Sequence, residues 1–221
     1  MSAEDGMPLP EGVQPGIREL LFSRGRVIFF LVAIVFELAI FFAATVVPID
    51  RSTQQNLTQA ANNLRNLTDT SPPLVTMRLI FSNNLRVALV EMVPGLGPIV
   101  LAASIFTTGQ LLQVVSIAAG YPSILVSIFL FAFPYTIIEL SAYPLAVVSG
   151  TMLLVAWRRR TLRKEIRVFL WELVGVVAVL LLAAAMETAT LLSATLGILL
   201  WLPMVFLAVL FALGRGRKGA R

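Results

Sequence analysis

The sequence predicts an all-α protein, a polytopic membrane helical bundle of about six transmembrane helices with its N- and C-termini in the cytoplasm. First, the chain is 58% hydrophobic and only 13% charged, with a mean hydropathy of +0.89. Second, the long apolar stretch over residues 79–157 contains only three fully charged side chains, Arg86, Glu91 and Glu139. Helices of a soluble domain need a polar face, and a bilayer removes that need. Third, the basic residues fall into clusters that one side of a membrane can hold.

The apolar runs are long enough to cross about 30 Å of hydrocarbon as helices. They predict one transmembrane domain over residues 27–213, between a cytoplasmic tail at 1–26 and a basic cytoplasmic tail at 214–221. The first run exceeds the apolar region of a cleaved signal peptide, so it is expected to remain as an anchor. The expected spans are residues 27–47, 79–107, 111–133, 136–157, 168–187 and 190–213.

A polar segment at residues 48–78 separates the first two spans and is expected outside the cell. Apolar side chains recur in it at helical spacing, which predicts an amphipathic helix lying on the membrane surface or on the bundle. Asp50 and Ser52 are expected to cap its start, and Pro72 and Pro73 to end it. The apolar positions are Leu57, Ala60, Ala61, Leu64 and Leu67.

Two positions in this external loop, Asn56 and Asn66, match the acceptor pattern for asparagine-linked glycosylation. An external loop would present both side chains to that modification. The same pattern also arises by chance in a segment rich in Asn and Thr, so both interpretations stand.

Proline and glycine interrupt the second span at residues 94–98. Proline lacks an amide donor and glycine loosens a helix, so this segment is expected to be a hinge, either a kink or a re-entrant turn. In lipid, its freed carbonyls need partners from the protein or from water in a cavity. We also expect a polar break at residues 108–110, a kink at 120–122 and a break at Pro134. The hinge residues are Pro94, Gly95, Gly97 and Pro98.

The basic residues predict the topology. Three precede the first span, six lie in the loop at residues 157–167 and four lie in the C-terminal tail, so 13 of the 17 share one side if six spans are formed. The positive-inside rule makes that side cytoplasmic. The loop is expected to contact anionic lipid rather than nucleic acid, because it adjoins a span. Its basic residues are Arg158, Arg159, Arg160, Arg163, Lys164 and Arg167.

Glu139 is the first candidate for function. Tyr135, Glu139 and Tyr143 recur every four residues, so on a helix they form one polar stripe. A carboxylate in hydrocarbon must be paired, wetted or protonated. Glu139 is therefore either a proton-, ion- or substrate-handling group or a polar clamp that fixes helix packing, and the sequence leaves both open.

Arg86, Glu91 and Asn84 complete the expected intramembrane polar cluster. Arg86 and Glu91 point about 140° apart on a straight helix, so they are not expected to pair with each other. Arg86 either pairs across helices, with Glu139 or Glu187, or extends to the outer interface.

Two further acidic residues are given structural interpretations. Glu37 interrupts the first span and is expected to make a bundle or oligomer contact. Glu172 follows Trp171 near the start of the fifth span, where an acid suits the helix dipole, and no chemistry is assigned to it.

The composition excludes several catalytic mechanisms. The chain has no histidine and no cysteine, which removes the Ser/His dyad, thiolate chemistry and the usual transition-metal ligands. Aspartate occurs only at positions 5, 50 and 69, and lysine only at 164 and 218, all outside the apolar runs. The sequence therefore predicts no enzyme, no cofactor and no metal site.

The chain resembles the stage II sporulation protein M family of integral membrane proteins, which also has archaeal members. The resemblance covers residues 81–150 and rests on Asn83-Asn84, on Thr108-Gly109, and on residues 134–140, which read Pro-Tyr-Thr-Ile-Ile-Glu-Leu. Ala142 and Gly150 follow. The chain departs from the family pattern at Tyr135 and Thr136, where His-Gly is usual, and at Thr108, where Asn is usual. Glu139 is the position that carries over.

This resemblance implies a scaffold, because the sporulation member holds cell-wall-remodelling enzymes during engulfment. Our first hypothesis is a non-enzymatic scaffold of the cell membrane that assembles with itself, as a dimer, or with envelope proteins around a packed, dry centre. The alternative is a transporter or channel for a small solute or ion. It would use Glu139 and the broken helix at residues 94–98, and it requires an aqueous cavity that reaches Glu139.

Overall fold

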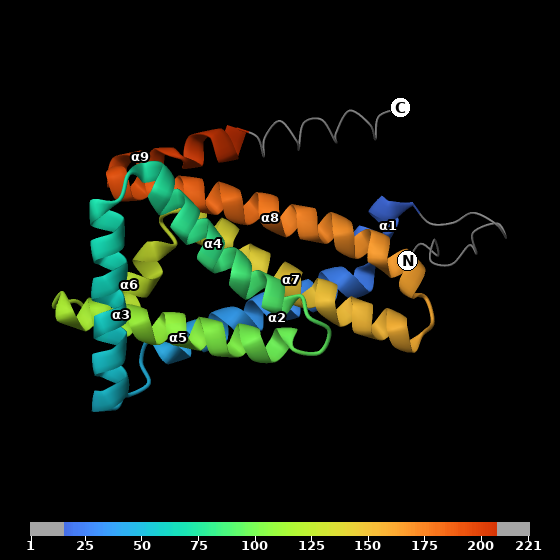
Figure 1. Ribbon diagram of the computed structural model, residues 1–221, viewed down its shortest axis with the longest axis horizontal. Helices are drawn as coiled ribbons and strands as arrows, with labels where there is room; N and C mark the ends of the chain where they lie inside the picture. Colours follow the sequence, from blue (N-terminus) through green and yellow to red (C-terminus); the bar gives the residue numbers. More distant parts are fainter. Residues whose placement is uncertain (1–15, 207–221) are drawn as a thin grey trace, which may run out of the picture.

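The computed structural model describes residues 16–206, which form helices and no strand (Figure 1). The all-α prediction is confirmed. The helices are α1 (Ile17–Leu21), α2 (Arg24–Ala44), α3 (Arg51–Thr70), α4 (Pro73–Glu91), α5 (Gly97–Ala118), α6 (Ser123–Leu130), α7 (Pro134–Arg158), α8 (Leu162–Leu192) and α9 (Ala194–Leu199). Residues 1–15 of the tail expected at 1–26, the tail expected at 214–221 and the end of the sixth expected span lie outside the described residues.

Four of these helices, α2, α5, α7 and α8, are long and apolar enough to cross a membrane. Helix α4 has the length, but Asn83, Asn84, Arg86 and Glu91 make it more polar. A shorter apolar helix covers Ala194–Phe206. The protein is therefore a helical membrane protein, and the count of six spans remains a prediction.

The four long apolar helices run along the longest axis of the molecule, while α3 lies across one end of them (Figure 1). The turn between α7 and α8 lies at the opposite end, close to α1. Helix α4 crosses the bundle obliquely and packs on α8 and α7. This arrangement gives the bundle two distinct ends, one covered by the polar helix α3 and one carrying the basic turn.

The expected second span at residues 79–107 is divided. Helix α4 ends at Glu91, and α5 begins at Gly97 after a turn in which Gly95 adopts a φ of 86°. Glycine reaches this conformation without strain, and Pro98 suits the first turn of a helix because no amide donor is needed there. The hinge at residues 94–98 is thus a reversal between two helices rather than a kink within one.

The polar break expected at residues 108–110 is wrong, because α5 continues through it. The hydroxyls of Thr107 and Thr108 donate to the carbonyls of Ala103 and Ser104, so their polarity is satisfied within the helix. Gly109 lies against α2, where a Cβ would come 2.7 Å from the carbonyl oxygen of Phe41. A glycine that was interpreted as a helix breaker therefore serves close helix packing.

Hydroxyl side chains also explain why the boundary expected between the fifth and sixth spans is absent. Helix α8 runs unbroken for 31 residues through the boundary expected after Glu187. Thr188 and Thr190 donate to the carbonyls of Ala184 and Met186.

In place of the kink expected at residues 120–122, α5 ends at Ala118 and Gly120 turns the chain with a φ of 80°.

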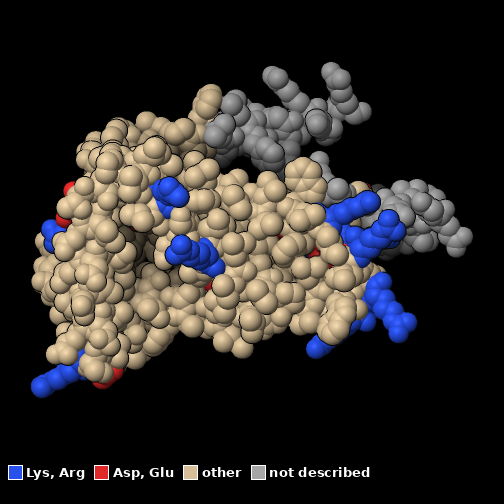
Figure 2. Space-filling view, in the orientation of Figure 1, with Lys and Arg blue, Asp and Glu red and all other residues tan. Residues whose placement is uncertain are grey.

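The basic loop expected at residues 157–167 is shorter than predicted. Only residues 159–161 separate α7 from α8, and the rest of the loop is helical. The six basic side chains, Arg158, Arg159, Arg160, Arg163, Lys164 and Arg167, are all exposed and gather at this end of the molecule (Figure 2).

The polar helix between the first two expected spans is confirmed as α3, which has no buried residue. Asp50 caps it: its carboxylate accepts the backbone amides of Ser52 and Thr53, each at 3.0 Å. Asn56 and Asn66 are exposed on this helix, and their glycosylation stays a prediction.

Small residues let the helices of the core approach one another. A Cβ on Gly150 of α7 would lie 2.5 Å from the carbonyl oxygen of Met92 at the end of α4. A Cβ on Gly97 would lie 2.4 Å from the carbonyl oxygen of Glu91 and 3.3 Å from Cα of Val147 on α7. Close approach of this kind stabilises helix pairs in lipid, where no hydrophobic force acts between helices.

We predict that Gly150→Ala destabilises the fold by about 1–3 kcal/mol, because the added methyl group meets a backbone carbonyl that cannot move aside. The matched control is Gly175→Ala on α8, where a Cβ meets nothing within 4 Å. That variant is expected to be neutral or stabilised by about 0.5 kcal/mol through helix propensity. Thermal unfolding in detergent measures both, and equal midpoints for the two variants would contradict the packing.

We also predict that the N-terminus of α3 frays in acid. Hydrogen bonds from the side chain of Ser52 and from Thr53 lower the pKa of the exposed Asp50 carboxyl below its ordinary value of 3.8. A lowered folded-state pKa means that the cap stabilises the helix fully above this ordinary value and is lost as the pH falls through the lowered one.

Amide hydrogen exchange at Ser52 and Thr53 tests the cap. Asp50→Ala should speed exchange at neutral pH, whereas Asp50→Asn, which can still accept the same amides, should keep protection at neutral and at acidic pH. Exchange that is the same in Asp50→Ala and the native chain would show that the cap contributes nothing.

Candidate functional site

A cavity of about 750 Å³ lies between α3, α4, α7 and α8. Arg65 of α3 and Arg78 and Arg86 of α4 line it, together with Glu139 of α7 and Glu187 of α8. We call it the outer cavity, because α3, which covers one end of the bundle, forms part of its wall. Its other polar lining residues are Thr68, Ser82, Asn83 and Asn84.

The position of each charge follows from its helix. Glu139 lies one to two turns from the start of α7, and Glu187 about as far from the end of α8, so both carboxyls lie near the end of the bundle that α3 covers. Arg86 projects from α4 toward the same space. The face of the molecule that carries α4 shows a hollow beside two isolated basic side chains (Figure 2).

Of the two alternatives left open for Arg86, the ion pair with Glu139 or Glu187 is not formed. All three side chains line the outer cavity, but within residues 16–206 the ion pairs are those of Arg26 and Arg65. Arg86 is exposed rather than enclosed by carboxylates. The cavity therefore holds opposite charges that face open space instead of one another.

The tyrosine stripe is formed in part. The hydroxyl of Tyr143 donates to Oε1 of Glu139 at 3.0 Å. Tyr135 instead stacks on Phe133, with ring centroids 6.0 Å apart. The amide of Asn83 donates to Asn84 at 3.3 Å. Glu139 thus keeps one oxygen on a buried tyrosine and remains part of the cavity wall.

Glu91 lies apart from the outer cavity. It is fully buried at the end of α4, and its Oε1 accepts the hydroxyl of Ser104 on α5 at 3.2 Å. The expected cluster of six residues is therefore two groups, one on the cavity and one inside the bundle.

An apolar core closes the bundle beneath the outer cavity. Along α7 it falls between Glu139 and Ser149, and along α8 between Glu187 and Glu172. Polar groups thus occur on either side of an apolar layer. Its buried members are Ala88, Met92, Leu101, Ala142, Tyr143, Ala146, Val147, Val176 and Leu180.

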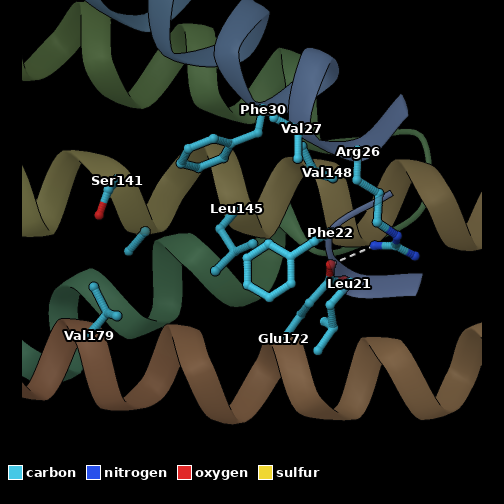
Figure 3. Close-up of a pocket in the computed structure, with 11 residues that line it drawn as sticks. Leu21, Phe22, Arg26, Val27, Phe30, Ser141, Leu145, Val148, Glu172 and Val179 are labelled. Carbon is cyan, nitrogen blue, oxygen red and sulfur yellow. Dashed lines mark hydrogen bonds and ion pairs between the residues drawn. The ribbon is translucent and has the colours of Figure 1, made fainter. Parts of the chain in front are cut away.

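A buried ion-pair network lies at the other end of the bundle, and sequence reasoning missed it. Nη1 of Arg26 on α2 donates to Glu172 on α8 at 2.5 Å, and Nη2 pairs with Glu165 (Figure 3). The second oxygen of Glu172 accepts the hydroxyl of Ser149 on α7 at 2.7 Å. The network ties α2, α7 and α8 together. The sequence analysis counted Arg26 only as a topology signal. Helix α2 begins at Arg24, three residues before the expected span, and therefore includes Arg26.

A small apolar pocket of about 230 Å³ adjoins this network. Phe22, Phe30 and Leu145 point into it, and Arg26 and Glu172 close one side (Figure 3). Every charged atom of that side already has a protein partner, so the pocket contributes apolar packing space rather than a second charged site.

The chemistry available in the outer cavity is recognition of charge. Three guanidinium groups and two carboxyls can bind a small ionic solute through charge-assisted hydrogen bonds. Within residues 16–206 no group of three or more acidic side chains is placed to hold a metal ion.

We predict that Arg26→Ala destabilises the protein by about 3–5 kcal/mol, because it leaves Glu172 buried without its counter-charge. The matched control is Arg24→Ala, two residues away and exposed, which should change stability by less than about 0.5 kcal/mol. The free energy of unfolding in mixed micelles measures both. Similar values for the two variants would show that the network is not formed.

Residues 27–190 match the family described as Stage II sporulation protein M. No curated protein and no solved structure matches the chain. The matched residues include Glu139 and Glu187 of the outer cavity and the acidic partners Glu165 and Glu172 of the ion-pair network, whereas Arg26 lies one residue before the match.

Proposed function

This chain belongs to the stage II sporulation protein M family, and we propose that it is a six-span protein of the cell membrane that binds and transports a small charged solute. The observation that carries the proposal is the outer cavity, which reaches Glu139 within the bundle. A transporter requires such a cavity, and a scaffold does not.

The proposed topology has α2, α4, α5, α7, α8 and the helix that starts at α9 as its six spans. It places the exposed basic residues around the α7–α8 turn in the cytoplasm, next to anionic lipid, and α3 outside. In this topology the first cytoplasmic turn between spans is at residues 92–96 rather than 108–110, and the spans on either side of it shift accordingly. Both termini keep the cytoplasmic location that was predicted.

The structure in this topology is open to the outside and closed to the inside. The outer cavity ends at Glu139, the apolar core fills the middle, and the Arg26–Glu172 network joins three helices at the cytoplasmic end. Passage of a solute requires the network to separate while the outer end closes, as in alternating access. Charge recognition and this exchange involve no covalent chemistry, which agrees with a chain without histidine or cysteine.

The second candidate function is the scaffold, and family membership favours it. In that role the chain would form a homo-oligomer, with the dimer as the expected form, or bind envelope proteins. Exposed residues of α3, such as Gln55 and Asn62, would offer a polar surface outside the membrane for such partners. Purification as a monomer without a partner would count against it.

Cysteine labelling tests the topology and the cavity, because the native chain has no cysteine. Asn83→Cys, on the cavity wall, should react with a membrane-impermeant maleimide added outside intact cells. Thr161→Cys, in the α7–α8 turn, should react only after the membrane is opened. Val174→Cys, exposed on α8 at membrane depth, is the unreactive control. Reaction of Thr161→Cys from outside would contradict the topology.

Solute binding is tested by protection of Asn83→Cys from the same reagent. The probes are inorganic phosphate, glutamate, lysine and glycine, which cover an anion, two zwitterions with opposite net charge and a neutral zwitterion. At least one probe should slow labelling by about tenfold or more, and Glu139→Gln should reduce that protection. Labelling that no probe slows would contradict solute binding and leave the scaffold as the better account.

A further inference from the structure

Glu37 is a fully buried acid in the middle of α2, and neither of its carboxyl oxygens has a hydrogen-bond partner. It lies about 20 Å along the helix from Arg24 and about 10 Å from Ala44, which places it within the hydrocarbon layer of the proposed topology. No lysine or arginine in residues 16–206 pairs with it. Apolar packing alone does not explain why a buried acid without a partner occupies this position.

Glu91 is the second acid of this kind. It is fully buried, its Oε1 accepts from Ser104, and its Oε2 has no partner. The described residues contain no cation paired with it. Neither of these two buried carboxyls therefore has a positively charged partner among the described residues.

Helix α5 brings the two acids together. Helices α2 and α5 run in the same direction (Figure 1), and Gly109 of α5 lies against Phe41, one turn beyond Glu37. Ser104, about one turn before Gly109, is therefore level with Glu37 and holds Glu91 by its hydrogen bond.

The groups that face this pair carry no positive charge. On α7, the hydroxyl of Tyr143 is engaged with Glu139, and Glu139 lies on the wall of the outer cavity. Helix α5 contributes the Ser104 hydroxyl. Two negative charges enclosed in a membrane bundle without compensation are strongly unfavourable, so something positive must accompany them.

We propose that Glu37 and Glu91 form a binding site for one monovalent cation, a proton or Na⁺, inside the bundle and separate from the outer cavity. The unpartnered oxygens of both acids supply the ligands, and Ser104 orients Glu91. A multivalent metal is a poor fit, because no third acidic side chain of the described chain completes such a group. The site goes beyond the proposed function and does not depend on it. If the chain transports a solute, the site supplies an ion that is transported with it.

The experiment uses the whole protein in lipid nanodiscs and two probes. Thermal unfolding is compared in NaCl and in choline chloride, and infrared difference spectra record the C=O stretch of protonated carboxyls at neutral pH. The variants are Glu37→Gln and Glu91→Gln, which keep the shape and remove the charge. The matched control is Glu19→Gln, which is exposed on α1.

Two results support the site and identify the ion. A midpoint that rises with Na⁺ in the native chain and in Glu19→Gln, but not in Glu37→Gln or Glu91→Gln, assigns Na⁺. A midpoint insensitive to Na⁺, with a protonated-carboxyl band that each of the two variants weakens and Glu19→Gln does not, assigns a proton.

The site is overturned if Na⁺ has no effect and neither variant changes the carboxyl band. Failure of both variants to fold also contradicts it, because a neutral isostere should be tolerated wherever the charge is already cancelled. A positive cation result together with no protection in the outer cavity would reject the transported solute and keep this site.

Discussion

The cost of an unpaired charge in hydrocarbon is the constraint on which the structure depends. It explains why the ionisable groups of the bundle point inward or toward its ends. Arg26 is surrounded by carboxylates, Glu139 is held by Tyr143, and Glu91 by Ser104. The apolar side chains of α2 and α8 can then cover the outside, where they are exposed in the absence of lipid.

The same constraint divides the molecule into layers along its long axis. The outer cavity holds separated charges, the middle is apolar apart from one pair of acids, and the basic end is closed by an ion-pair network. A scaffold needs no open charged cavity, and a transporter needs each of these layers. The layered arrangement is therefore the reason that we favour transport over assembly, although family membership is compatible with both.

The sequence predicted the helical membrane class, the capped polar helix α3 and the Tyr143–Glu139 contact, because composition and local spacing determine them. It could not locate the helix ends inside the apolar runs. Thr107, Thr108, Thr188 and Thr190 look like breaks in a sequence, but in lipid their hydroxyls bond to the preceding turn and the helix continues. The Arg26–Glu172 pair was also out of reach, because it joins residues 146 positions apart and no local pattern records which helices become neighbours.

A density map of the protein in lipid nanodiscs, at a resolution that shows ordered water, tests the central claim most directly. The account predicts water between α3, α4, α7 and α8 that reaches the carboxyl of Glu139, and no water in the apolar core beneath it. A map in which side chains, lipid or a second subunit fill that space and leave Glu139 dry would contradict it.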